Sequence, residues 1–190
     1  MSQDEARFPM VPTLAATLGV KGHRPLVGTR DNKDLLYVLA VVNLVSAAVH
    51  ANTLESPKDA KKRTGQSKTR RLQDAFAAHL RHVGRVYPQE QHARVVLLID
   101  NAPWHRGQPI EEALRDNPHL EFKRLPSYSP QLNPIERFWK KLRRRATHNR
   151  LFDTLADLKA SLRASLCYFQ TMRVKVRSIL EGRPRKKASK

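Results

Sequence analysis

Apolar side chains along this chain follow two periods, one typical of strands and one typical of helices. Residues 35–54 are rich in β-branched and aromatic side chains, and the segment from Asn43 to Ser46 breaks the run. This pattern favours two antiparallel strands joined by a tight turn in a sheet buried on both faces, with a single buried helix as the alternative. Shorter apolar runs at 95–99 and 120–125 predict two further strands.

Helical spacing of apolar residues is present in other segments. Residues 69–83 predict an amphipathic helix, and residues 109–115 predict a short helix with a proline in its first turn. Another helix is predicted to begin with Asn133 as its N-cap, Pro134 at its first position and Glu136 at its third position.

The last predicted helix begins at a capping box formed by Thr154 and Asp157. Its apolar residues continue at steps of three and four from Leu155 to Ile179, which predicts one long helix. The single cysteine, Cys167, lies within this pattern and is expected to be a buried thiol. One cysteine also excludes an intramolecular disulfide and a cysteine-based zinc site.

Strands that alternate with helices predict an α/β domain with a mixed sheet. At 190 residues the chain is long enough for one domain with a hydrophobic core. Residues 1–8 are polar, and residues 9–34 are rich in turn formers and predict a loop with at most a short strand. We expect residues 1–150 to form the domain, residues 151–181 a C-terminal helix packed on it, and residues 182–190 a basic disordered tail.

The charge balance changes this picture from an ordinary soluble domain to a protein that attracts polyanions. Lys and Arg number 36 against 17 acidic residues, a net charge of +19, and a field of that sign attracts nucleic acid. A merely basic protein is the alternative. The polar N-terminus shows no signal peptide, and the apolar run at 35–49 is too short and mixed to span a bilayer, so we expect a cytoplasmic protein without membrane contact.

Two segments concentrate the positive charge. Residues 56–71 predict a flexible basic loop, which is either a solvated linker or an arm that contacts phosphates. The helix that starts at Pro134 carries a second group of cations on the faces that its apolar residues leave open. The candidate DNA-binding residues are Lys61, Lys62, Arg63, Arg70 and Arg71 in the first segment, and Lys140, Lys141, Arg143, Arg144 and Arg145 in the second.

Two carboxylates stand at the ends of predicted rigid elements, as a metal site in an α/β fold requires. Asp100 directly follows the strand at 95–99, and Glu136 lies in the first turn of a helix. Taken alone, Asp100 fits a turn residue and Glu136 fits a capping acid. Together they fit a site for Mg²⁺, which binds carboxylates and keeps several waters. Such a site needs a third acid, and the candidates are Asp4, Asp31 and Asp34.

The sequence around these acids carries a family resemblance. Asp100-Asn101-Ala102 with His105, followed by the segment LPSYSPQLNPIERFW from Leu125 to Trp139, closely resembles the second and third acidic motifs of DDE transposases of the mariner-like insertion-sequence type. The 35 residues between Asp100 and Glu136 suit that family. Asp4-Glu5 with the downstream Gly22-x-Arg24-Pro25 looks like the first acidic motif, so the resemblance covers about residues 3–150.

The resemblance implies an RNase H-like fold, in which a mixed central sheet is flanked by helices and Asp4 and Asp100 lie on adjacent central strands. It implies two Mg²⁺ ions, for which Mn²⁺ can substitute, with Asp4 bridging both ions, Asp100 holding one and Glu136 the other. It also implies DNA cleavage at the element ends, followed by attack of the freed 3′-hydroxyl on target DNA. Asn101, His105 and Asn133 would orient the acids, although His105 taken alone also fits a surface histidine.

Two features depart from the family pattern. Full-length relatives carry helix-turn-helix domains before the catalytic domain, and only three residues precede Asp4, so its strand is expected to be clipped. The chain is therefore either the catalytic half of an insertion-sequence transposase or a truncated, inactive remnant that only binds nucleic acid. An RNase H-type ribonuclease is a third hypothesis. The expected partners of an active form are element-end and target DNA, a separately encoded N-terminal helix-turn-helix half, and a second copy of the chain in a homodimer.

Overall fold

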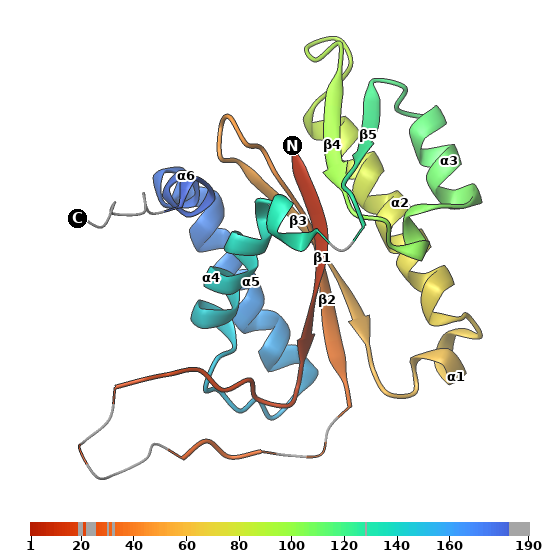
Figure 1. Cartoon of the computed structure of the whole chain (residues 1–190). Helices are drawn as coiled ribbons and strands as arrows, with labels where there is room; N and C mark the ends of the chain where they lie inside the picture. The colour runs from red at the N-terminus through yellow and green to blue at the C-terminus, as the bar shows by residue number, and fades with distance from the viewer. Residues whose placement is uncertain (19–20, 22–25, 30, 32, 128, 183–190) are drawn as a thin grey trace, which may run out of the picture.

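A single mixed sheet of five strands forms the centre of the molecule (Figure 1). The computed structural model describes residues 1–18, 21, 26–29, 31, 33–127 and 129–182. Its strands are β1 (Ser2–Pro9), β2 (Leu35–Val42), β3 (Val49–Ser56), β4 (Val95–Ile99) and β5 (Leu120–Arg124). The order across the sheet is β3-β2-β1-β4-β5; the first three strands pair antiparallel, and β4 runs parallel to both β1 and β5.

The strands predicted from apolar runs are confirmed. Residues 35–54 form the hairpin of β2 and β3, and the alternative of a single helix is wrong. The turn forms here because the Asn43 side chain accepts hydrogen bonds from the backbone N–H groups of Val45 and Ser46, while Ala47 adopts a positive φ of 58°. The side chains of β2 are buried from Leu36 onward, as expected for a strand covered on both faces.

The polar N-terminal residues form β1, a strand that the apolar pattern does not predict. Ala6 and Phe8 are its buried apolar residues, and the buried Ser2 and Gln3 are polar. Pairing with β2 along all eight residues holds the strand in the middle of the sheet. Asp4 is the third residue of β1, so the strand extends for five residues beyond this acid.

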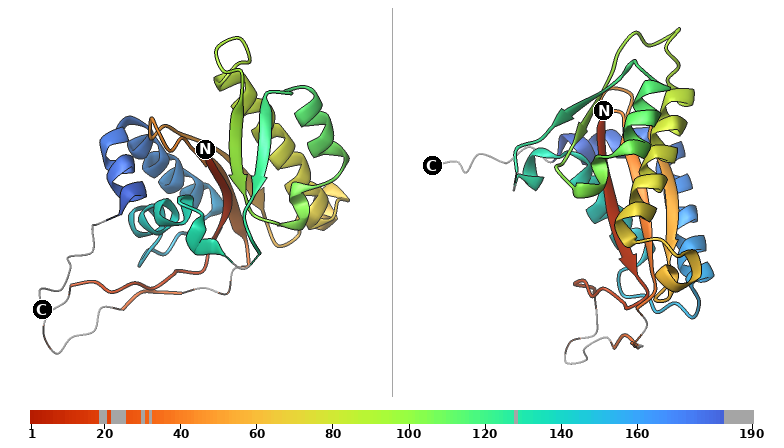
Figure 2. Two further views of the ribbon diagram at one scale, coloured as in Figure 1. Left: turned by 45° about the horizontal axis from the view of Figure 1, so that its top comes forward. Right: turned by 90° about the vertical axis from the view of Figure 1, so that its right-hand side faces the viewer.

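Helices cover both faces of the sheet (Figure 2). On one face, α2 packs with α3 over an apolar cluster that includes Phe76, Leu80 and Ile99. On the other face, α4, α5 and α6 pack over a cluster that includes Phe8 and Trp139. The helices are α1 (Ala60–Thr64), α2 (Lys68–Val86), α3 (Gln108–Arg115), α4 (Ile135–Ala146), α5 (Leu155–Thr171) and α6 (Arg173–Glu181), with short 3-10 turns at Pro103–His105 and Pro130–Leu132.

The prediction of a flexible loop at 56–71 is wrong, because two helices begin within this segment. The carboxylate of Asp59 pairs with Arg63 one turn later at 2.6 Å, which supports α1. Gly65 ends α1 in the left-handed conformation, with φ of 69°. Ser67 then caps α2 by accepting a hydrogen bond from the N–H of Arg70.

The predicted capping box at Thr154 is confirmed, but the single long helix after it is wrong. The helix breaks at Met172, whose φ and ψ of −95° and 59° are not helical, and α6 follows. The break turns the chain so that Val176 and Ile179 are buried in the same cluster as α4 and α5. Cys167 is exposed rather than buried, because it lies outside the face of α5 that contacts the core.

Several predictions fall on residues that the structure does not describe. These are the basic tail at 183–190 and the Gly22-x-Arg24-Pro25 part of the first motif. Within the described residues of the 10–34 segment, the strand content is limited to an isolated bridge between Thr13 and His148. None of the helices in the described ranges is long and apolar enough to cross a bilayer.

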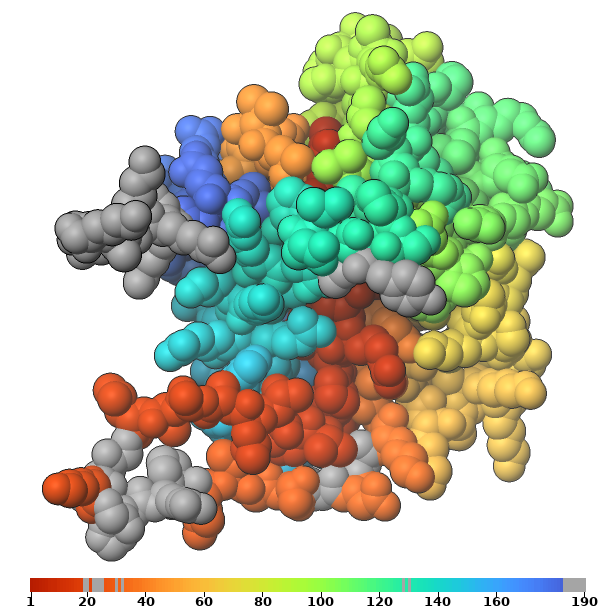
Figure 3. All heavy atoms as spheres, in the orientation of Figure 1, coloured from red at the N-terminus to blue at the C-terminus, as the bar shows by residue number. Residues whose placement is uncertain are grey.

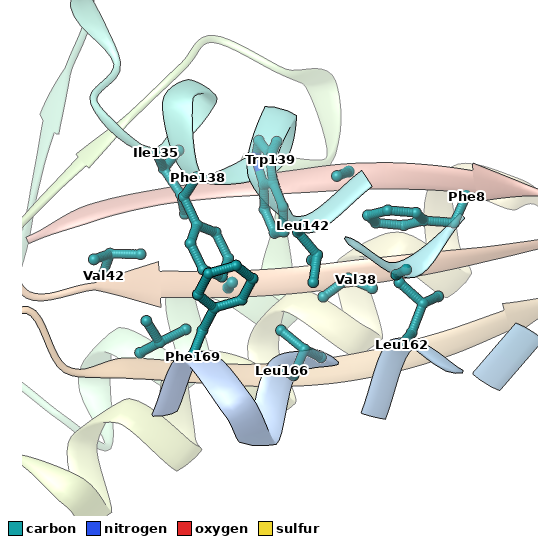
Figure 4. Close-up of a cluster of buried hydrophobic side chains, with 14 of the residues drawn as sticks. Phe8, Val38, Val42, Ile135, Phe138, Trp139, Leu142, Leu162, Leu166 and Phe169 are labelled. Carbon is teal, nitrogen blue, oxygen red and sulfur yellow. The ribbon is translucent and has the colours of Figure 1, made fainter. Parts of the chain in front are cut away.

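The core under α4 determines where the N-terminal end of this helix lies. Figure 4 shows Phe138, Trp139 and Leu142 pointing from α4 toward the strands, with Phe169 of α5 beside Phe138. The rings of Phe138 and Phe169 meet edge to face, with centroids 5.3 Å apart. All three side chains of α4 are 0–1% exposed, so their packing fixes the helix against the sheet.

We expect Phe138→Ala to lower the free energy of unfolding by about 3–5 kcal/mol, because it removes a fully buried ring and leaves a cavity. Urea unfolding followed by tryptophan fluorescence measures the change. Val174→Ala is the control, because Val174 is 85% exposed, and a change within about 0.5 kcal/mol is expected there. A Phe138→Ala effect as small as that of the control would contradict the packing described for α4.

Candidate active site

Three acidic residues from three different elements line one cavity of about 410 Å³. Asp4 is the third residue of β1, Asp100 directly follows β4, and Glu136 is the second residue of α4. Because β1 and β4 run parallel with Ser2 opposite Leu98, the same register brings Asp4 beside Asp100. The three acids predicted from the sequence therefore line the same cavity, beside the interior strands β1 and β4.

The three carboxylates share the cavity without gathering around one point. Across the described ranges, no group of three or more His, Cys, Asp or Glu side chains is placed to hold a metal ion. The Asp4 carboxylate instead accepts a 2.9 Å hydrogen bond from the indole N–H of Trp139, and Asp100 accepts one from a backbone N–H. The alternative third acids, Asp31 and Asp34, do not line the cavity.

Hydrogen bonds between the start of β1 and the start of α4 position Glu136. The predicted N-cap role of Asn133 is wrong, because α4 begins one residue later and lacks a side-chain cap. The Ser2 hydroxyl donates to the side-chain oxygen Oδ1 of Asn133 and accepts from the backbone N–H of Ile135 at 3.2 Å. Asn133 also donates to the carbonyl of Gln3 at 3.3 Å. The residue expected to cap the helix thus joins it to the central strand.

Burial strongly affects the Asp4 carboxylate. Burial, together with repulsion from Glu5, raises the pKa of Asp4 to about 7, against hydrogen bonds from the Glu5 N–H and Trp139 that lower it. The charge of Glu136 adds a smaller upward effect on the same pKa. A carboxyl group in this state gains stability from a nearby cation, because the cation favours its ionised form.

The buried side chains of Glu5 and His105, on the opposite face of β1 from Asp4, form a polar chain that ends at the half-exposed Asp100. The Nε2 atom of His105 lies 3.0 Å from both carboxylate oxygens of Glu5, and its Nδ1 atom lies 3.0 Å from Asp100 Oδ1. Trp104 adds a 3.1 Å hydrogen bond from its indole N–H to Glu5. The side chains of His105 and Glu5 are 0% and 3% exposed, so His105 is not a surface histidine.

With both carboxylates ionised, His105 donates from both of its ring nitrogens, because an ionised carboxylate only accepts hydrogen bonds. Burial alone would lower the pKa of His105, but the hydrogen bonds and charges of Asp100 and Glu5 raise it to about 10. The hydrogen bond from His105 in turn lowers the pKa of Asp100, despite partial burial. Asp4 and Asp100 therefore differ in protonation near neutral pH, because their surroundings differ.

The predicted orienting residues have different contacts. Among the three, His105 contacts an acid directly. Asn101 donates a 2.8 Å hydrogen bond to the carbonyl of Leu125 and lines the cavity, and Asn133 lines it as well. Neither Glu5 nor Trp139 was among the site residues predicted from the sequence. An acid directly beside Asp4, and a tryptophan one turn after Glu136, are the only sequence signals for them.

The predicted DNA-binding cations divide into two groups. In the first segment, Arg63 pairs with Asp59 and Arg70 pairs with Asp74, so part of their charge is neutralised within the chain. In α4, Arg143 lies close enough to the cavity for the charges of Glu136 and Asp4 to act on its pKa, which burial lowers. The remaining cations of α4, at Lys140, Lys141, Arg144 and Arg145, line two other cavities.

The chain thus combines a mixed sheet flanked by helices with Asp, Asp and Glu side chains that line one cavity beside its interior strands. A family model described as DDE superfamily endonuclease matches residues 1–159. The chain belongs to this family. The resemblance to DDE transposases that the acidic motifs carry is therefore confirmed.

Two curated relatives extend this result. The chain is 36% identical over 85 residues to "Uncharacterized protein y4pE/y4sA" of Sinorhizobium fredii (strain NBRC 101917 / NGR234), an alignment that covers 45% of this chain and 58% of the relative. It is 24% identical over 161 residues to "Insertion element IS630 uncharacterized 39 kDa protein" of Shigella sonnei, covering 85% and 42%. The chain spans about half the length of the curated relatives it matches.

Solved structures of the Mos1 mariner transposase share the fold. A pre-cleavage Mos1 transpososome superposes with a TM-score of 0.62 at 20% identity, over 95% of this chain and 53% of that chain. The catalytic domain of Mos1 mariner transposase superposes with a TM-score of 0.57 at 20% identity, over 95% and 78%. The predicted RNase H-like fold is therefore confirmed.

We expect the free energy of unfolding of Asp4→Asn to increase relative to that of the wild type as pH rises. Because the pKa of Asp4 is about 7 in the folded protein and 3.8 when the group is fully exposed to water, the folded protein retains a proton that the unfolded chain releases between these values. The contribution of Asp4 to stability is full below about pH 4 and is lost as pH rises through about 7, by at most about 4 kcal/mol. Urea unfolding at several pH values in metal-free buffer measures this difference.

Asp116→Asn serves as the control for this series, because Asp116 is a 56% exposed partner of Arg81. A stability difference between Asp4→Asn and the wild type that stays constant from pH 4 to 8 would show that the Asp4 carboxyl group titrates normally.

We expect Glu5→Ala to lower the free energy of unfolding by about 3–5 kcal/mol, because it leaves the buried imidazolium of His105 without one of its partners. Urea unfolding at pH 7 measures the change. Glu55→Ala is the matched control, because Glu55 forms an exposed ion pair with Lys159, and pairs of that kind contribute about 0–1 kcal/mol. Equal effects of the two substitutions would contradict a buried charged chain at Glu5.

Proposed function

We propose that this chain is the catalytic domain of an insertion-sequence transposase, which cuts a DNA strand and transfers the freed 3′-hydroxyl to target DNA in a metal-dependent reaction. The shared cavity of Asp4, Asp100 and Glu136 carries this proposal, because it lies beside the interior strands β1 and β4 of a DDE superfamily domain. The net charge of +19 supports a nucleic-acid substrate.

Asp4, Asp100 and Glu136 are the residues that would hold two Mg²⁺ ions, with Mn²⁺ as a substitute. Their carboxylate oxygens are the donors that such hard cations prefer, and the amide side chains of Asn101 and Asn133 border the same cavity. Mos1 structures described with Mn and with Mg support the choice of metal. When bound, two such ions stabilise the attacking and leaving oxygens of a phosphodiester displacement.

The residues of this chain prepare the site in specific ways. His105 keeps Asp100 ionised and fixes its orientation, because its Nδ1 atom donates to this carboxylate from a buried position. To hold a cation, Asp4 would have to give up its hydrogen bond from Trp139, and because burial raises its pKa to about 7, the ionised form that binds a cation predominates only above about pH 7. The Arg143 guanidinium donates a 3.3 Å hydrogen bond to the Arg7 carbonyl, near enough for the charges of Glu136 and Asp4 to act on it, and its positive charge would favour a phosphate bound nearby.

An inactive remnant that only binds nucleic acid is the second candidate function. The observation that favours it is the placement of the acids, which do not form a ready metal cluster among the described residues. Recognition of element ends by a separately encoded helix-turn-helix half, and assembly as a homodimer, stay predictions for the active form.

We expect Asp100→Asn and Glu136→Gln each to reduce metal-dependent nicking of element-end duplex DNA by at least about 10³-fold, because each removes a ligand worth several kcal/mol of transition-state stabilisation. Gel analysis of end-labelled duplexes in Mg²⁺ or Mn²⁺ measures nicking, and fluorescence anisotropy in metal-free buffer confirms that DNA binding is retained.

Asp116→Asn is the control, because this exposed acid of the Arg81 pair lies outside the cavity. DNA binding by the wild type without cleavage in either metal would support the remnant instead. Cleavage of RNA–DNA hybrids without cleavage of duplex DNA would support the ribonuclease hypothesis.

A further inference from the structure

A large cavity lies away from the acids, between α4, α5 and α6. It has a volume of about 700 Å³, and its cationic lining consists of Lys141, Arg144 and Arg145 of α4, Arg150 of the following loop and Lys175 of α6. A second cavity of about 390 Å³ shares Lys141 and Arg144 with it and adds Arg137, Lys140 and His148. We call the two together the α4–α6 groove.

The groove lies along an accessible part of the surface. In Figure 3, α4 (cyan) is at the surface between α6 (blue) above and the segment that connects β1 to β2 (red to orange) below. Ala15 of that connecting segment and Ile179 of α6 both line the smaller cavity. The groove is therefore bounded by three parts of the chain, with the basic side of α4 in the middle.

The positive charge of the groove has no acidic counterpart. Among the described residues, neither cavity is lined by an aspartate or a glutamate, and no ion pair involves Lys141, Arg144 or Lys175. Arg63 and Arg70 near α1 differ in this respect, because each is paired with an aspartate. Uncompensated cations in a concave surface are stabilised by a polyanionic ligand.

The cations are also partly held in place. The guanidinium of Arg145 lies 3.7 Å from the ring centre of Tyr168, and Arg150 donates a 3.3 Å hydrogen bond to the hydroxyl of Ser161. Both contacts leave the guanidinium groups charged and restrict their rotamers. The loss of side-chain entropy when an anion binds is therefore smaller than for unrestrained arginines. Burial and the nearby charges of Arg143 and Arg144 lower the pKa of His148, which is consistent with a positive field in the groove.

The position of the groove on α4 connects it to the acid cavity. Glu136 lies in the first turn of α4 and Arg145 lies nine residues later, in its last turn. At 1.5 Å per residue the separation along the helix is about 14 Å. This corresponds to about four base pairs along a duplex axis. Nine steps of about 100° also turn Arg145 to the other side of α4 from Glu136, so this figure is the axial part of the separation, and a bound duplex would have to cross α4 between the two positions. The guanidinium and ammonium groups of the groove would there bind phosphates.

We propose that the α4–α6 groove binds the phosphodiester backbone of duplex DNA about four base pairs from the strand that enters the acid cavity. The position of the groove relative to the cut rests on the proposed function. The binding of DNA phosphates in the groove does not depend on it. The groove would act as a sequence-independent anchor that sets the register of the duplex, because phosphate contacts position DNA without reading its bases.

The first test compares two double variants that each remove two positive charges. Lys141→Gln with Arg144→Gln changes the groove, and Arg85→Gln with Arg115→Gln changes two exposed cations on the opposite side of the sheet. Affinity for a duplex is measured by fluorescence anisotropy from 50 to 300 mM salt without metal. We expect the groove variant to bind roughly 50-fold more weakly near 0.1 M salt and to lose about 1.8 from the salt slope, whereas the control changes little.

A second test locates the contact. Single methylphosphonate groups, which are neutral, replace successive phosphates of the duplex. Those about four base pairs from the nick should weaken binding of the wild type and have no effect on the groove variant. Thermal melting of every variant confirms folding before binding is compared.

Equal weakening by the groove and control variants would overturn the proposal, because it would show that net charge alone determines binding. The same conclusion follows if every methylphosphonate affects the groove variant as it affects the wild type. The absence of nicking by the wild type would instead contradict the proposed function, and the comparison of the two double variants would remain valid.

Discussion

A small buried polar junction between the first residues of β1 and the first residues of α4 positions the site. Ser2 and Asn133 are buried, and their side chains bond to each other and to backbone groups of Gln3 and Ile135. Burying a polar group costs free energy unless the group is hydrogen-bonded, so these bonds favour the arrangement of β1 and α4 in which all of them form. Because Asp4 and Glu136 each lie within three residues of it, the junction sets their relative position.

The two faces of β1 then give the neighbouring acids different surroundings. Successive side chains of a strand point to opposite faces, so Asp4 faces α4 and Glu5 faces the turn that carries His105. Asp4 is desolvated and has a raised pKa, whereas Glu5 is balanced by a buried imidazolium that also contacts Asp100. The dipeptide Asp4-Glu5 thus provides one candidate metal ligand, Asp4. Through His105, its Glu5 also supports a second candidate ligand, Asp100, at the end of β4.

The sequence predicted elements where the local pattern was sufficient, and it failed where tertiary contacts decide. The run at 95–99 is apolar throughout and became β4, with Asp100 at its end. β1 has few apolar residues, so pairing with β2, which sequence periodicity does not reveal, determines it. Asn133 has the side chain of an N-cap, but its contact with Ser2 is 131 positions away in sequence. Cys167 follows Leu166, and one step of about 100° moves it off the buried face of α5.

The charges of α4 connect the structure to the proposed function. Its acid, Glu136, lies in the first turn, and Arg143, Arg144 and Arg145 lie in the last turn, which is the arrangement that the helix dipole favours. The apolar face of the same helix is fixed by Phe138, Trp139 and Leu142 in the core. Under the proposed function, this rigid helix would hold the metal-binding position at Glu136 and the phosphate-binding position at Arg144 and Arg145 at a fixed separation. In the proposed reaction, that distance would select which phosphate of a bound strand reaches the acids, without any contact to a base.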